Sequence, residues 1–133
     1  MGDLPRKLKK DAVAEALLEV RFDSTELGEL VVGKLASHEM WRSFPSSRLP
    51  LADIPAPVRQ ADPNLAHQAV LERRNPDVTR VVKIGDRVFS YHALPPYPGW
   101  EALEPELLRA MEFVFGSVED FTANGLAFDI STC

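Results

Sequence analysis

The chain has 133 residues, of which 45% are hydrophobic and 26% are charged, and its formal net charge is −5. These values are typical of one globular domain and argue against a disordered chain. A single cysteine, Cys133, excludes an internal disulfide, and no apolar run is long enough to span a bilayer. We therefore expect one cytoplasmic domain over residues 1–133, with a basic arm at residues 1–11 and no membrane or secretory segment.

The first predicted element covers residues 14–22. Apolar residues occupy every second position of this segment, which is the period of a half-buried strand. Composition favours a helix instead, because Ala, Leu and Glu are helix formers. A helical stripe would also accommodate Val13, Ala16, Leu17 and Val20. We predict a strand.

A helix is expected next. Asp23 and Glu26 have the spacing of a capping box, and Leu27, Leu30, Val31 and Leu35 follow at helical spacing. This helix should run to about Arg42 and end before Pro45. The five prolines of residues 45–63 then predict a long ordered connection, with one short extended piece at Leu49–Leu51.

Three further strands and one helix are predicted beyond this connection. A strand is expected at Ala66–Arg74, followed by a hairpin of Val78–Ile84 and Val88–Ala93 that turns at Gly85-Asp86, where both residues tolerate positive φ. Pro105 should lie in the first turn of the second helix and Gly116 at its end. The predicted buried stripe of this helix is Leu107, Leu108, Met111, Val114 and Phe115. A turn at Asn124-Gly125 and a last strand at Leu126–Thr132 complete the chain.

The predicted order is therefore β-α-β-β-β-α-β. Hairpin connections favour an antiparallel sheet, and amphipathic helices cover a sheet on one face. We expect an α+β fold with a mainly antiparallel sheet of about five strands and two helices on one face.

Motifs for catalysis, phosphate binding and metal binding are absent from the sequence. His38, His67 and His92 lack the spacing of metal ligands, and Cys133, at a terminus expected to fray, should lack the fixed base that a catalytic thiol needs. The carboxylates of Glu104 and Glu106 are expected on a solvated helix face. We predict a protein that is not an enzyme, without catalytic residues, cofactor or metal. An enzyme or small-molecule binder with an unrecognised site, in a groove between sheet and loops, stays an alternative.

Charge is distributed unevenly along the chain. Seven acids against Arg109 give residues 101–133 a net charge of −6. Such a segment suits a basic protein surface and opposes direct binding of nucleic acid. The predicted contacts are Glu101, Glu104, Glu112, Glu119 and Asp120. The alternative is that these charges only keep the protein soluble.

The proline-rich loop LPPYPGW is the most unusual segment. Prolines restrict the loop, while Tyr97 and Trp100 belong to the residue types that anchor interfaces. We include both as candidate partner-binding residues, and packing of the two rings on the sheet is the alternative. We also expect a homo-oligomer if the last strand lies at a sheet edge, where its backbone groups are free to pair with another copy.

Four segments carry a family resemblance. They are LPRKLKKDAVAEALLEVRF, ELVVGKL, LPLADIPAPVRQADPNL and LPPYPGW. With these segments the chain resembles the N-terminal half of an uncharacterised, sporadically distributed bacterial family associated with mobile elements and phage defence. Where that family commonly reads GLRYIN, this chain departs in the acidic direction, with Ala127 and Asp129. The resemblance implies no known activity.

Together these features predict a non-enzymatic protein–protein interaction module. The acidic surface suggests an inhibitor that binds the basic channel of a nucleic-acid-handling defence complex, as anti-CRISPR proteins do. A component of a toxin–antitoxin or phage-defence operon that binds a cognate protein is the alternative.

Overall fold

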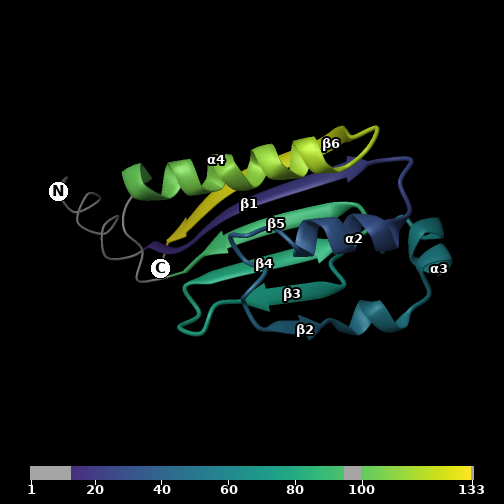
Figure 1. Cartoon of the computed structure of the whole chain (residues 1–133), viewed down its shortest axis with the longest axis horizontal. Helices are drawn as coiled ribbons and strands as arrows, with labels where there is room; N and C mark the ends of the chain where they lie inside the picture. Colours follow the sequence, from purple (N-terminus) through teal and green to yellow (C-terminus); the bar gives the residue numbers. More distant parts are fainter. Residues whose placement is uncertain (1–12, 95–99, 133) are drawn as a thin grey trace.

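The computed structural model describes residues 13–94 and 100–132, which form a six-stranded antiparallel sheet in the order β2-β3-β4-β5-β1-β6 (Figure 1). Within these described residues three α-helices and one 3-10 helix accompany the sheet, so the predicted α+β fold with an antiparallel sheet is confirmed, with one strand and one α-helix more than expected. The strands are β1 (Val13–Asp23), β2 (Ser46–Arg48), β3 (Leu71–Arg74), β4 (Arg80–Gly85), β5 (Val88–Ala93) and β6 (Thr122–Thr132). The helices are α2 (Gly28–Ala36), η1 (Pro50–Asp53), α3 (Ala56–Ala61) and α4 (Trp100–Ser117).

Strand β1 runs through the interior of the sheet, between β5 and β6. The apolar residues at every second position determine its conformation, because Ala16, Leu18, Val20 and Phe22 are all buried on one face. The strand prediction is therefore confirmed over the helical composition. Burial of a continuous apolar face outweighs intrinsic propensities, which differ by less than about 1 kcal/mol per residue.

Helices α2 and α4 lie over the same face of the sheet (Figure 1). Between them and the strands, Trp41 is fully buried and its indole Nε1 donates a hydrogen bond to the carbonyl oxygen of Leu35 over 2.7 Å. The Trp41 ring packs against Phe89, with ring centroids 5.3 Å apart. This aromatic cluster joins the segment after α2 to the middle of the sheet.

The opposite face of the sheet is not covered by any α-helix within residues 13–94 and 100–132. We call it the helix-free face. Its side chains alternate along the strands with those of the core. They include Leu17, Glu19, Arg21, Glu72, Val81, Lys83, Val88, Ser90 and His92.

The first predicted helix is wrong at both ends. The expected capping box does not form, because Leu27 is the N-cap and makes no side-chain cap. The Glu26 carboxylate accepts instead from the backbone N–H of Glu119, over 3.0 Å. The helix ends at Ala36 rather than near Arg42, since the chain turns there to carry Trp41 into the core.

The region between α2 and β4 is also more structured than predicted. The extended piece lies at Ser46–Arg48, as β2, whereas the predicted position overlaps η1. Helix α3 forms within the proline-rich connection, with Pro55 as its N-cap. Only Leu71–Arg74 of the predicted strand at Ala66–Arg74 is a strand.

The predicted hairpin is confirmed as β4 and β5, but its turn is Asp86-Arg87. Gly85 pairs with Val88, and neither Asp86 nor Arg87 has a positive φ. Gly85 is needed for space instead, because a Cβ there would overlap the backbone oxygen of Gln68.

The predicted turn at Asn124-Gly125 is wrong, because both residues lie within β6. The chain turns earlier, at Asp120, whose φ is 49°. Strand β6 lies at an edge of the sheet. Pro105 lies inside α4 and not in its first turn, because the helix already begins at Trp100.

Candidate functional site

Three of the predicted acidic contacts lie on the outward face of α4, together with two exposed apolar residues. Steps of three and four residues place these five on one side of a helix. We call this set the α4 stripe: Glu101, Glu104, Leu108, Glu112 and Phe115. The three carboxylates make no hydrogen bond or ion pair with the part of the chain that the structure describes.

Leu108 and Phe115 were predicted to be buried, and the structure corrects this. They are 49% and 42% exposed. The buried face is Leu103, Leu107, Ala110 and Val114, spaced by four, three and four residues, and the α4 stripe lies on the other side of the helix. Leu108 and Phe115 each follow a buried residue by one position, about 100° around the helix, which turns them toward solvent.

The other predicted acids, Glu119 and Asp120, lie in the turn that follows α4. The Asp120 carboxylate accepts a hydrogen bond from the Thr25 hydroxyl over 2.7 Å. The backbone of Glu119 bonds to the Ser24 and Glu26 side chains. These two residues hold the end of α4 against the start of α2, so their first role is structural.

Of the two aromatic candidates of the proline-rich loop, the structure describes only one. Tyr97 lies outside the described residues. Trp100 is described as the first residue of α4. Neither the predicted packing of these rings nor their predicted role in recognition is tested by the structure.

Glu106 is not on a solvated face, which corrects the expectation for the Glu104 and Glu106 pair. Its carboxylate accepts hydrogen bonds from the Tyr91 hydroxyl and from Nε of Arg80, the latter over 2.5 Å. Burial, together with the Glu106 hydrogen bond and charge, raises the pKa of Tyr91 far above its ordinary value. Burial would lower the pKa of Arg80, but the hydrogen bond and charge of Glu106 raise it. This cluster ties α4 to β4 and β5.

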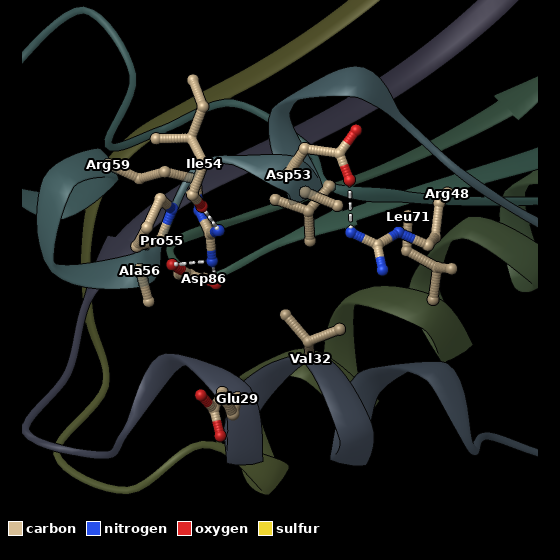
Figure 2. A pocket seen from close by; sticks show the side chains of 12 residues that line it. Glu29, Val32, Arg48, Asp53, Ile54, Pro55, Ala56, Arg59, Leu71 and Asp86 are labelled. Carbon is tan, nitrogen blue, oxygen red and sulfur yellow. Dashed lines mark hydrogen bonds and ion pairs between the residues drawn. The ribbon is translucent and has the colours of Figure 1, made fainter.

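A groove of about 470 Å³ lies between α2 and the segment from η1 to α3 (Figure 2). Its lining combines apolar side chains with two ion pairs. Arg59 donates from Nη2 to both carboxylate oxygens of Asp86, over 3.0 and 2.9 Å, and also bonds the Ile54 carbonyl. At the other end Arg48 pairs with Asp53 over 2.7 Å, with both side chains exposed.

The Arg59–Asp86 pair fixes the groove. Both side chains are less than a tenth exposed, so the pair links α3 firmly to the turn between β4 and β5. Gly28 makes the close approach of α2 possible, because a Cβ there would lie 2.6 Å from Cγ of Asp86. No local motif marks this pair, whose members are 27 residues apart in the sequence. The charges of Arg59 and Asp86 neutralise each other, so the rest of the groove lining is mainly apolar.

A second cavity, of about 680 Å³, lies on the helix-free face. The strands contribute polar side chains to it, and the segments Leu49–Leu51 and His67–Ala69 form its walls. Ser90 is buried there, and its hydroxyl lies 2.9 Å from Nε2 of His92.

A hydrogen-bonded Ser and His suggest a nucleophile and its base. Acyl transfer also needs donors for the oxyanion. Strand β5 is paired with β1 on one side and β4 on the other, so its backbone groups belong to the sheet ladders.

Within residues 13–94 and 100–132, no group of three or more His, Cys, Asp or Glu residues could hold a metal ion. Among the described helices, none combines the length and apolar character needed to cross a membrane.

Comparison of the chain with protein-family models, curated proteins and solved structures found no match. The family resemblance stays a prediction from sequence.

Proposed function

We propose that this protein is a protein–protein interaction module whose α4 stripe binds a basic surface of a partner protein. One observation carries the proposal: three carboxylates without partners in the described structure share a helix face with exposed Leu108 and Phe115. Exposed apolar groups supply the buried area of an interface, while surrounding charges steer association and select the partner. The net charge of −6 over residues 101–133 supports a basic partner.

The chemistry of the partner follows from this charge. Proteins that handle nucleic acids present basic channels, and an acidic helix can occupy such a channel in place of phosphates. The resemblance to a family linked to phage defence supports an inhibitor of this kind. A cognate protein of a toxin–antitoxin or defence operon is the second candidate. The same acidic surface disfavours direct binding of nucleic acid.

The partner must first be isolated from a host lysate, with nuclease treatment to remove bridging nucleic acid. Association is then measured for wild type and for Glu104→Lys/Glu112→Lys. We expect the double reversal to slow association at least about tenfold, with little change in melting temperature, because exposed charges act mainly on encounter.

The matched control is Glu29→Lys/Asp77→Lys. It makes the same change in net charge at two exposed acids outside α4. The control should associate nearly as fast as wild type. If both double variants slow association equally, the effect belongs to net charge and not to the α4 stripe. If neither does, the acids serve only solubility.

Assembly into a homo-oligomer is a separate proposal. Strand β6 extends over 11 residues at the edge of the sheet and contains no proline or lysine, the residues that commonly protect edges. A second copy could pair with it as an added strand. A strictly monomeric mass in light scattering at high protein concentration would contradict this.

A further inference from the structure

We propose that the cavity on the helix-free face binds a small organic carboxylate with an apolar tail, and that Lys83 is the residue that holds the carboxylate. This site is independent of the α4 stripe, because the two lie on opposite faces of the sheet.

The register of the strands places Lys83 in the middle of a polar row. Antiparallel pairing sets Glu72 opposite Lys83, Lys83 opposite Ser90, and Ser90 opposite Glu19. Directly paired residues point to the same face of a sheet. The row therefore runs across β3, β4, β5 and β1 on the side away from the helices.

Both acids of this row already have cationic partners. Nε of Arg74 donates to the Glu72 carboxylate over 2.8 Å, and Nε of Arg21 donates to Glu19 over 2.9 Å. Lys83, by contrast, is half-buried and makes no ion pair or hydrogen bond in the described part of the chain. A half-buried ammonium without a counterion favours binding of an anion.

The composition of the cavity favours the same class of ligand. Arg21 and Lys83 are two cations against one carboxylate, that of Glu19, in a protein whose overall charge is −5. The Ser90 hydroxyl adds a second polar group beside Lys83. Small-ligand sites commonly combine a few convergent polar groups with apolar walls.

The walls select for an apolar tail. Leu49, Pro50 and Leu51 line one side, and Val88 and Ala69 add further apolar surface. The volume of about 680 Å³ exceeds what a bare inorganic anion needs. An amphipathic monocarboxylate would use both the ammonium and the apolar wall.

The test is an NMR titration of the 15N-labelled full chain at pH 7 with octanoate as the probe. Octan-1-ol and inorganic phosphate serve as the tail-only and charge-only comparisons. We expect octanoate to shift the amide signals of Lys83, Ser90 and Leu51, and to bind more tightly than either comparison. Lys83→Met should weaken octanoate binding at least about tenfold, the effect of losing one charge-assisted hydrogen bond.

Two further variants keep the proposal falsifiable. Arg42→Met removes one exposed positive charge at a residue that does not line the cavity, and it should leave octanoate affinity unchanged. Leu51→Asp puts a carboxylate into the apolar wall and should abolish binding even if Lys83→Met fails to fold. The proposal is overturned if octanoate shifts none of these signals, if octan-1-ol or phosphate binds as tightly, or if Leu51→Asp binds octanoate like wild type.

Discussion

The two faces of the sheet are built from the same strands but have opposite characters. On β5, Phe89 and Tyr91 point into the core under the helices, whereas Ser90 and His92 point to the helix-free face. Adjacent residues thus serve packing on one side and polar chemistry on the other. The covered face fixes the register, because a shift by one residue would move the aromatic residues into the polar cavity.

This contrast separates stability from binding. The side chains of the covered face interlock with α2 and α4, and their cost of substitution should be high. On the helix-free face the half-buried Lys83 makes no bond with the described residues and should tolerate change, although Val81, Val88 and Ser90 are buried there. Four predictions test whether the two faces differ in this way.

The largest expected effect is on the covered face. Phe89→Ala should lower the free energy of unfolding by about 3–5 kcal/mol, because Phe89 is fully buried against Trp41. Its chain neighbour gives the matched comparison: Ser90→Ala should cost about 0.5–1.5 kcal/mol, the value of one hydrogen bond. Urea unfolding of both variants measures the difference. Equal losses would show that the two faces are equally constrained.

The second prediction concerns the link between the covered face and α4. The pKa of Tyr91 is raised above 10.0, so its contribution to stability is complete below pH 10 and is lost as pH rises beyond that value. The free energy of unfolding should fall by at most about 1.4 kcal/mol per pH unit from this group. The free energy of unfolding of Tyr91→Phe should fall less steeply than that of wild type between pH 9.5 and 11.5 (roughly the range in which an unperturbed Tyr ionises). Identical slopes would contradict the raised pKa.

A smaller effect is expected at low pH, from His38. Burial between Trp41 and Phe113, and then the charge of Arg109, lower the pKa of His38 below 6.5. A histidine with a depressed folded pKa contributes stability above its unfolded pKa, and this is lost as pH falls through the folded pKa. An NMR titration of the His38 ring should give a midpoint below 6.5. A midpoint at or above that value would show the ring to be solvated.

The smallest effect is predicted for the helix-free face. Lys83→Met should change the free energy of unfolding by no more than about 0.5 kcal/mol in the absence of ligand, since Lys83 has no bonded partner among the described residues. Thermal unfolding measures this directly. A loss of several kcal/mol would mean that Lys83 supports the fold and would erase the contrast between the faces.

Local patterns explain what could be predicted. β1 follows from the alternation of apolar residues, the β4–β5 hairpin follows from two β-rich runs around a two-residue turn, and an antiparallel sheet follows from the hairpin. Helix positions were less predictable. α4 buries Leu103, Leu107, Ala110 and Val114, whereas Leu108 and Phe115, each one position (about 100°) further around the helix than a buried residue, face outward although they too are apolar.

The positions of several charged side chains could not be predicted, because they are set by contacts between segments that are distant in the sequence. Glu106 reads as a surface acid, yet it meets Arg80 and Tyr91 from two strands. Arg59 and Asp86 meet only once the chain has folded. Of the predicted contacts, the structure keeps Glu101, Glu104 and Glu112 on one face, and it gives Glu119 and Asp120 a structural place in a turn.

The position of β1 also has a consequence for biosynthesis. This strand leaves the ribosome before the other strands of the sheet, yet its partners begin only at Val88 and Thr122. The meander of β3, β4 and β5 can form from local contacts, while β1 must wait with its apolar face uncovered. We expect slow folding governed by this long-range closure, and dependence on chaperones when synthesis outpaces it.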